Sequence, residues 1–257
     1  MGIIAITGAA SGIGRATRER LEKDGHTVIG IDLRDAEVIA DLSTEGGRRV
    51  LTREVDRESG GVLDGLVVAA GVRGDDGAPV VSVNYFGAIA ALEGLRPLLE
   101  RGENSSAVAI GSNSVTTHPG YPIDVAEWCL ADDEPRARHA AADDGIGAYT
   151  ASKLALSLWV RRQATTMEWA GAGIRLNAIA PGFIDTPLTD GMWEYMGSLG
   201  EVYPIPAQRP GTAEEVAALL VYLLSPDAAY FCGSIVVMDG GTEAALRPDD
   251  WPRPMEI

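Results

Sequence analysis

Residues 3–14 read Ile3-Ile4-Ala5-Ile6-Thr7-Gly8-Ala9-Ala10-Ser11-Gly12-Ile13-Gly14. The apolar, β-branched run Ile3–Thr7 predicts a buried strand, and Gly12–Lys23 has the pattern of a helix that follows it. Glycines in the turn between them permit positive φ angles and a close approach of the backbone to a pyrophosphate. The N–H groups at the helix N-terminus would bind that anion. A tight turn without a ligand is the alternative, but the strand–turn–helix context favours a dinucleotide site.

The rest of the chain alternates between apolar runs and helical patterns. Further strands are expected at Thr27–Asp32, Glu37–Leu42, Asp64–Ala70, Ser106–Gly111, Ile174–Ile179 and Ser234–Met238. Helices are expected from a Ser43 or Thr44 cap to about Glu58, and at Pro79–Arg101, Ala148–Ala170 and Ala213–Leu224. This alternation predicts an α/β fold with a doubly wound parallel sheet. No linker or repeat interrupts it, so we expect one domain over residues 1–257.

Two segments do not fit a simple alternation. Only Leu33–Ala36 separates the second and third strand candidates, although parallel neighbours normally need a crossover of about a dozen residues. Either this crossover is degenerate or Glu37–Leu42 is irregular. Residues 116–147 are long and acidic, and we interpret them as an ordered insertion at the mouth of the site. Within this insertion, Ile123–Ala131 and Pro135–Ala142 could each form a short helix.

The composition narrows the class of protein. A formal net charge of −16 argues against nucleic acid or an anionic membrane as partner. The 2 cysteines form no C-x-x-C pair and the 3 histidines are scattered, so we expect neither a disulfide framework nor a metal site. Neither a signal peptide nor a transmembrane span is evident. We expect a protein of the cytoplasm.

Asp32 ends the second predicted strand. A carboxylate there can accept hydrogen bonds from both ribose hydroxyls and would repel a 2′-phosphate, which favours NAD over NADP. Arg15 and Arg34 are nearby and could host a phosphate instead, although we interpret them as solvated. The residues expected to contact the dinucleotide are Gly8, Ser11, Gly12, Ile13, Gly14, Asp32, Leu33, Asp41, Leu42, Ala69, Ala70, Gly71, Tyr149, Lys153, Pro181, Gly182, Ile184 and Thr186.

The sequence Tyr149-x-x-x-Lys153 is the candidate acid/base pair. The chain contains only two lysines, Lys23 and Lys153. Residues four apart lie on one face of a helix, so the phenol and the ammonium would be neighbours. A free phenol has a pKa of about 10. A fixed ammonium and a positively charged nicotinamide would both favour the phenolate. An exposed helical pair without function is the alternative.

Two polar residues complete the candidate constellation. Ser112 follows a predicted strand, where open α/β sheets place ligands, and its hydroxyl could bind a substrate oxygen. Asn113 and Ser114 are alternatives that periodicity does not separate. Asn84 lies within the long helix after the fourth strand and would need partners if buried. It could bind a water that relays protons to Lys153, or it could bond only within its own helix.

Residues 187–210 are rich in glycine, proline, methionine and aromatic residues. We interpret them as a mobile lid over the substrate, and "lid" refers to these residues below. Its apolar wall would consist of Leu188, Met192, Trp193 and Met196. Ordinary helix packing would explain the same pattern.

These motifs together resemble the short-chain dehydrogenase/reductase family. The matching positions are Thr7-Gly8-x3-Gly12-x-Gly14, Asn84, Ser112, Tyr149-x3-Lys153 and Pro181-Gly182. The resemblance implies a Rossmann-type sheet of about seven strands and interconversion of alcohols and carbonyls with NAD or NADP. It also implies that Asn84, Ser112, Tyr149 and Lys153 act together as catalytic residues, and that the protein is a homodimer or tetramer. Ser112 is preferred over Ser114 by the register of the family.

Residues 30–44 and 82–87 are similar to the bacterial 3α-hydroxysteroid dehydrogenase/carbonyl reductase branch of that family. That branch shares the short second crossover and an insertion before the tyrosine, and it implies NAD and a bulky apolar alcohol or ketone, such as a hydroxysteroid. The composition of the insertion differs from that branch. A dihydrodiol, a terpenoid or another cyclic alcohol is therefore an alternative substrate, and a dinucleotide-binding regulator without turnover is a less favoured function.

Overall fold

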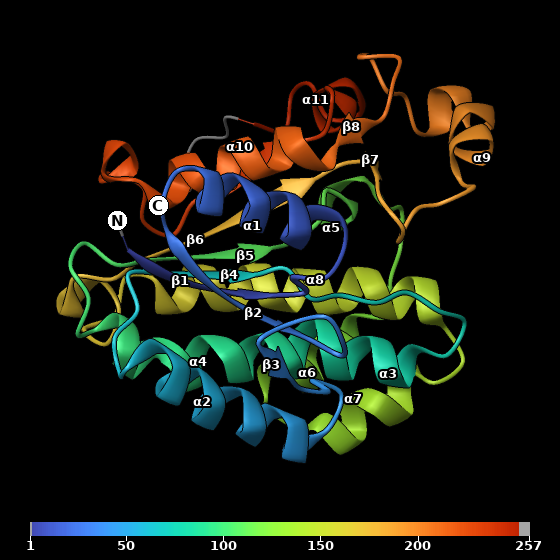
Figure 1. The fold of residues 1–257 in the computed structure, drawn as a ribbon. Helices are drawn as coiled ribbons and strands as arrows, with labels where there is room; N and C mark the ends of the chain where they lie inside the picture. Colours follow the sequence, from blue (N-terminus) through green and yellow to red (C-terminus); the bar gives the residue numbers. More distant parts are fainter. Residues whose placement is uncertain (1, 252–257) are drawn as a thin grey trace, which may run out of the picture.

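The computed structural model describes residues 2–251. Its centre is a parallel sheet of seven strands in the order β3-β2-β1-β4-β5-β6-β9 (Figure 1). The strands are β1 (Ile3–Thr7), β2 (Thr27–Asp32), β3 (Val38–Ile39), β4 (Gly65–Val68), β5 (Ser106–Ile110), β6 (Arg175–Pro181) and β9 (Ile235–Met238). The order reverses between β1 and β4, so the carboxyl ends of these strands border a crevice. The predicted doubly wound sheet is confirmed.

Helices cover both faces of the sheet (Figure 1). Helices α1 (Gly12–Lys23) and α10 (Ala213–Leu224) pack together on one face. Helices α2 (Glu45–Ser59), α4 (Ala88–Leu99) and α8 (Gly145–Gln163) cover the other face. Each layer encloses its own cluster of buried apolar side chains.

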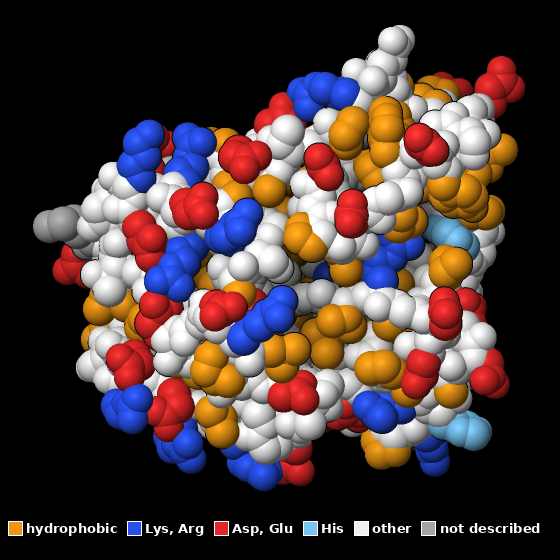
Figure 2. Space-filling model, turned by 45° about the vertical axis from the view of Figure 1, so that its right-hand side comes forward, with side chains coloured by type: hydrophobic (Ala, Val, Ile, Leu, Met, Phe, Trp, Pro, Cys, Tyr) orange, Lys and Arg blue, Asp and Glu red, His pale blue; other side chains and the backbone are white. Residues whose placement is uncertain are grey.

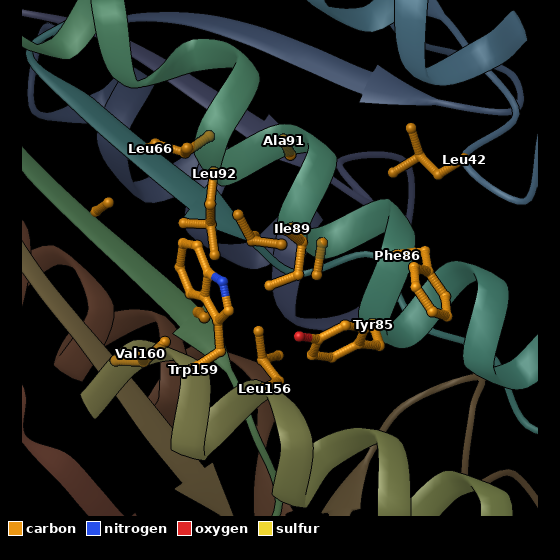
Figure 3. Packing of buried hydrophobic residues seen from close by; sticks show 14 of the residues in the cluster. Leu42, Leu66, Tyr85, Phe86, Ile89, Ala91, Leu92, Leu156, Trp159 and Val160 are labelled. Atoms are coloured by element: carbon orange, nitrogen blue, oxygen red, sulfur yellow. The ribbon is translucent and has the colours of Figure 1, made fainter. Parts of the chain in front are cut away.

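The larger cluster fixes α8 against α4 (Figure 3). Leu156 and Trp159 of α8 point toward Ile89 and Leu92 of α4, and Val160 belongs to the same cluster. Burial of one such side chain contributes about 1.5–3 kcal/mol. The helix that carries Tyr149 and Lys153 is therefore held along its length by core packing.

The third strand is only two residues long, and the crossover that precedes it is Leu33–Glu37, one residue longer than the predicted Leu33–Ala36. Val38 pairs with Ile31, and the N–H of Ala40 donates to the carbonyl of Asp32 at 2.9 Å. Of the two interpretations, the degenerate crossover is correct. The strand is shorter than the predicted Glu37–Leu42.

Two further boundaries differ from the prediction for identifiable reasons. Strand β4 ends before Ala69, because the N–H groups of Ala69 and Ala70 donate to the Thr7 hydroxyl at 3.1 Å instead of joining the sheet. Helix α8 was expected at Ala148–Ala170. It begins at Gly145 because Asp144 accepts from the N–H of Gly147, and it ends at Gln163, whose carbonyl accepts from the Thr166 hydroxyl at 2.8 Å.

One long apolar helix follows β4. It consists of α3 (Gly77–Val81), a π-helical turn η1 (Ser82–Gly87) and α4. The whole stretch has the length and hydropathy of a membrane span, but 61% of its most apolar window is buried inside the fold. It is a core helix, as the packing in Figure 3 shows.

The insertion forms two short helices, α6 (Ile123–Leu130) and α7 (Glu134–Ala141), as expected. They pack against α3 and α8. Arg48 of α2 holds α7 in place, because its guanidinium donates to both carboxylate oxygens of Glu134 at 2.6 and 2.8 Å. The same guanidinium donates to the carbonyl of Ser82 in η1 at 2.9 Å. The insertion is therefore an integral part of the helical layer.

The lid lies beyond the sheet, at the right of Figure 1. It contains α9 (Trp193–Ser198), and a separate pair of strands, β7 (Ile184–Asp185) and β8 (Gly211–Thr212), brackets it. This pair was not predicted, because each strand is two residues long and leaves no periodic pattern. The remaining short elements are α5 (Ser114–Thr117), α11 (Thr242–Leu246), and the 3₁₀ turns η2 (Ala170–Ala172), η3 (Gly200–Val202) and η4 (Pro226–Ala228).

Candidate active site

A cavity of about 240 Å³ opens at the carboxyl ends of the central strands. All 18 residues expected to contact a dinucleotide line this cavity, and so does Ser112. On the right of Figure 2, hydrophobic side chains surround a group of Lys or Arg side chains. The lining residues that sequence reasoning missed are Ile31, Ala40, Val72, Val83, Ile110, Gly111, Pro187, Leu188 and Thr189, of which Leu188 was expected only in the lid wall.

The glycine-rich turn leaves room for a ligand against its backbone. Gly8 and Gly12 have φ angles of 72° and 49°, which other residues rarely adopt. A Cβ on Gly14 would lie 2.1 Å from the carbonyl oxygen of Gly8. Ser11 occupies the N-cap of α1, but its side chain forms no cap hydrogen bond. The N–H groups of the first helical turn are therefore available, and the site fits a pyrophosphate.

Asp32 is held at the edge of this turn. Its carboxylate accepts from the N–H of Ala10 at 3.0 Å and from the N–H of Leu33 at 2.7 Å. These bonds fix the carboxylate at the cavity, where it can accept ribose hydroxyls. Asp41 lies farther along the cavity and accepts from the N–H and hydroxyl of Ser43 at 2.9 and 2.6 Å.

Thr7 ties the two central strands together, a role that the sequence did not suggest. Its fully buried hydroxyl accepts from the N–H groups of Ala69 and Ala70. Those bonds draw the end of β4 against the glycine turn, where a Cβ on Gly8 would lie 2.8 Å from the Ala70 nitrogen. A polar residue at the end of a strand was the available signal.

Tyr149, Lys153 and Ser112 converge on the opposite end of the cavity. The Lys153 ammonium donates to the carbonyl of Ile110 at 2.7 Å and lies 5.9 Å from the centre of the Tyr149 ring. The Ser112 hydroxyl accepts from the N–H of Ser114 at 3.1 Å, which orients it. The Ser114 hydroxyl is buried without a hydrogen-bond partner among the described residues and does not line the cavity. The geometry therefore favours Ser112 over Ser114.

Asn84 lies beside the cavity and does not line it. Its side chain donates to the carbonyl of Val72 at 3.0 Å and accepts from the N–H of Val72 at 2.8 Å. It thus clamps the loop after β4, and the alternative of bonding only within its own helix is wrong. Asn84 lies within the π-helical turn, a local feature that is frequent at functional sites. A Cβ on Gly71 would lie 3.4 Å from the Asn84 oxygen and 3.7 Å from the Lys153 nitrogen, so the three residues adjoin.

Burial is the largest cause of the pKa shifts of Tyr149 and Lys153. It raises the pKa of Tyr149 above its ordinary value, and the neighbouring Ser112 hydroxyl and Arg73 guanidinium only partly offset this. Burial also lowers the pKa of Lys153 to about 8. The protein without cofactor therefore holds Tyr149 as the neutral phenol at neutral pH. The positive charge of a bound nicotinamide would favour the ionised phenol.

A second polar cluster connects the site to the lid. Asn113, next to Ser112, donates to the Tyr203 hydroxyl at 2.9 Å and to the Asp239 carboxylate at 3.1 Å. Asp239 in turn accepts from the N–H groups of Gly241 and Glu243. Sequence reasoning treated Asn113 only as a rival of Ser112 and missed Tyr203 and Asp239, because these residues are brought together from three distant segments.

The apolar wall of the lid is partly formed. Leu188 lines the cavity, whereas Trp193 packs against Phe183 with ring centres 5.7 Å apart. Met192 contacts Arg73, with 3.3 Å between its sulfur and the guanidinium. Leu188 thus faces the cavity, whereas Trp193 packs against Phe183 outside the lid, and the mobile lid stays a prediction.

Comparison with known proteins agrees with this geometry. A family model described as short chain dehydrogenase matches residues 2–122, and one described as enoyl-(acyl carrier protein) reductase matches residues 137–243. The chain is 42% identical to the 3-alpha-hydroxysteroid dehydrogenase/carbonyl reductase of Comamonas testosteroni, over 96% of this chain and 99% of that protein. The chain belongs to the short-chain dehydrogenase family. It is an oxidoreductase of this family, and the predicted resemblance is confirmed.

Solved structures support the same assignment. The 3-alpha-hydroxysteroid dehydrogenase from Pseudomonas sp. B-0831, complexed with NADH, superimposes with a TM-score of 0.88. It is 42% identical, over 96% of this chain and 99% of that one. A more distant relative, levodione reductase of Leifsonia aquatica, is 28% identical over 95% of this chain and 94% of that protein. A nicotinamide dinucleotide is therefore the cofactor expected of this dehydrogenase.

Proposed function

We propose that this short-chain dehydrogenase interconverts a secondary alcohol and a ketone on a bulky apolar substrate, with a hydroxysteroid as the first candidate and NAD as the cofactor. The observation that carries the proposal is the convergence of Tyr149, Ser112 and Lys153 in one cavity with the glycine turn and Asp32. Two of the relatives named above, which are hydroxysteroid dehydrogenases at 42% identity, support the substrate class.

In the oxidation direction, the Ser112 hydroxyl would donate a hydrogen bond to the substrate oxygen. Tyr149 would accept the proton of the substrate hydroxyl, and Lys153 would stabilise the phenolate from the next turn of α8. Bound NAD would supply the acceptor for the hydride that leaves the alcohol carbon. Asn84 would act from behind the cavity, by holding Val72 and the loop that borders Lys153. The reverse reaction would use Tyr149 as the acid.

Turnover and binding separate this function from a regulator that only binds a dinucleotide. We expect Tyr149→Phe to bind NADH as the wild type does and to lose turnover by about 10²–10⁴-fold, because the proton acceptor is gone. NADH binding is measured by fluorescence and turnover by nicotinamide absorbance. Full activity in Tyr149→Phe would disprove the mechanism, and binding without turnover in the wild type would favour the regulator.

A substrate panel tests the finer part of the proposal. Hydroxysteroids with the hydroxyl at different ring positions and simple cyclic alcohols are assayed with NAD and with NADP. NAD-linked oxidation of a hydroxysteroid would support the proposal. Turnover of small alcohols alone would keep the chemistry and replace the substrate by a cyclic alcohol, dihydrodiol or terpenoid.

Asp32 carries the choice of cofactor. We expect Asp32→Asn to raise the ratio of NADP to NAD efficiency by about tenfold or more, since roughly 1.4 kcal/mol of charge repulsion corresponds to that factor. An unchanged ratio would remove this role from Asp32.

We also propose that the protein works in the cytoplasm as a homodimer or tetramer. Sedimentation of the purified protein tests the oligomeric state.

A further inference from the structure

Arg73 is a charged residue at the site that the mechanism above does not use. It follows β4 in the loop that borders the cavity, and its guanidinium carbon lies 5.6 Å from the centre of the Tyr149 ring. Lys153 lies at a similar distance, 5.9 Å, from the same ring. The phenol is therefore flanked by two cations from two different elements, α8 and the loop after β4.

The chain beside Arg73 and the guanidinium group of Arg73 are both held by contacts. The preceding residue, Val72, has its N–H and its carbonyl bonded to the Asn84 side chain at 2.8 and 3.0 Å. At the other end, the guanidinium contacts the sulfur of Met192 in the lid at 3.3 Å. The side chain thus extends from a clamped loop to the lid and passes the ring of Tyr149.

No carboxylate neutralises this arginine. Among residues 2–251, Arg73 forms no ion pair, although the chain carries a net charge of −16 and many other arginines are paired. A paired guanidinium would offer the phenol little net positive charge. An unpaired one retains its full charge for a partner in the cavity.

The two cations differ in how they respond to pH. Burial lowers the pKa of Lys153 to about 8, so its charge fades in the alkaline range where the phenol ionises. An arginine stays protonated throughout that range. The neighbouring guanidinium of Arg73 lowers the pKa of Tyr149, against the larger effect of burial. Above about pH 8, Arg73 is the remaining permanent cation beside the ring.

We propose that Arg73 is a positioning residue that holds a permanent positive charge against the ring of Tyr149 and thereby favours the ionised phenol during oxidation of the alcohol. This inference rests on the proposed function, in which Tyr149 is the base. The other titratable groups that the structure places near the phenol are Lys153 on its own helix and Tyr203 from the lid, with Asp239 behind Tyr203.

The sign of the effect follows from the charge. A cation near a phenol stabilises the phenolate and lowers its pKa, so removing the cation raises that pKa. Arg73 is exposed to solvent, which screens its charge, so we expect Arg73→Met to move the alkaline-rising limb of the oxidation rate to higher pH by up to about one pH unit. Arg73→Lys should recover most of the wild-type profile. A variant that merely loosened the lid would lower the rate without moving the limb.

Two measurements make the test decisive. The first is the pH profile of kcat/KM for oxidation of a neutral hydroxysteroid by wild type, Arg73→Met and Arg73→Lys. The second is the ultraviolet titration of Tyr149, taken as the difference between each protein and its Tyr149→Phe counterpart, which isolates one phenol among the 7 tyrosines. Arg53→Met is the matched control, since Arg53 is an exposed arginine on α2, away from the cavity.

The proposal predicts that both midpoints rise in Arg73→Met and stay unchanged in Arg53→Met. Unmoved midpoints would overturn it. A selective rise in KM for a steroid that carries a carboxylate, with unmoved midpoints, would also overturn it and assign Arg73 to binding of an anionic substrate. A shifted Tyr149 titration in a protein that oxidises no hydroxysteroid would uphold the role of Arg73 and reject the proposed substrate.

Discussion

The two sides of the cavity are built from different atoms. The cofactor side consists of backbone and small residues at the ends of β1 and β4, where Gly8, Gly14 and Ala70 lie in close contact. The opposite side, where we expect the substrate, is bordered by longer side chains from the loop after β4 and the lid, such as Arg73, Leu188 and Tyr203. Where the cavity is built from closely packed backbone, an added methyl group has almost no room. Where it is bordered by side chains, a single residue can be replaced without moving the backbone. Variants on each side therefore test whether this difference is real.

The largest effect is expected from a methyl group added on the cofactor side. In Gly14→Ala the new Cβ would lie 2.1 Å from the Gly8 carbonyl oxygen, so the turn must move. We expect a loss of about 3 kcal/mol or more in the free energy of unfolding, together with loss of NADH binding. Gly197→Ala in the lid is the matched control, because nothing lies within 4 Å of its Cβ. Urea denaturation and NADH fluorescence measure both, and equal behaviour of the two variants would contradict the comparison.

The next largest effect is expected at Lys153, whose ammonium group is buried beside the cavity. Lys153→Met should raise the free energy of unfolding at neutral pH by up to about 3 kcal/mol, because the folded protein must charge an amine whose pKa is lowered from 10.5 to about 8. Loss of the hydrogen bond to the Ile110 carbonyl offsets about 1 kcal/mol of this. Turnover should be lost.

The difference in unfolding free energy between the wild type and Lys153→Met should depend on pH. Between pH 8 and 10.5 the unfolded chain holds the lysine proton and the folded protein does not, so the stability of the wild type rises with pH relative to the variant. The advantage of Lys153→Met should therefore shrink across this window. Lys23→Met, the exposed counterpart, should show no such trend. Denaturation curves at several pH values measure the difference, and a constant advantage would argue against a buried titrating amine.

A smaller effect is expected where the insertion meets the helical layer. Burial acts to raise the pKa of Glu134, but the hydrogen bonds from Arg48 lower it on balance below its ordinary value. Glu134→Gln should cost about 1–2 kcal/mol of unfolding free energy, less than the loss of a fully buried pair. Glu58→Gln, in an exposed pair with Arg57, should cost at most about 0.5 kcal/mol. Similar losses in the two variants would show that the insertion is only loosely attached.

The smallest effect is expected at the lid. Tyr203→Phe removes the hydroxyl that bonds to Asn113, at a cost of about 0.5–1.5 kcal/mol. Because this bond connects the lid to the loop of Ser112, we expect KM for the alcohol to rise a few-fold while kcat changes little. Tyr195→Phe is the control, since Tyr195 is exposed on α9. Steady-state kinetics distinguish the two, and a change in kcat alone would place Tyr203 in the chemical step.

The cofactor side was predictable because its requirements are local. A few neighbouring residues are enough to recognise each of its features. These are a glycine-rich turn, an acid at the end of a strand, and a tyrosine four residues before a lysine. The two insertion helices, of 8 residues each, were also anticipated as possible short helices. The roles of Thr7, Asn113, Asp239 and Arg73 were missed because each acts on a partner far away in the sequence. A polar residue at the end of a strand is a signal, but it does not show which partner that residue has.

The sequence by itself determined the alternation of strands and helices, the dinucleotide turn and the tyrosine–lysine pair, because periodicity and short-range spacing specify them. Only the tertiary structure decided which partners those residues have. It showed that Asn84 clamps Val72, that Ser112 rather than Ser114 faces the cavity, and that burial lowers the pKa of Lys153 to about 8. Those outcomes depend on which segments pack together, and a pKa depends on how much water remains around the group after they have packed.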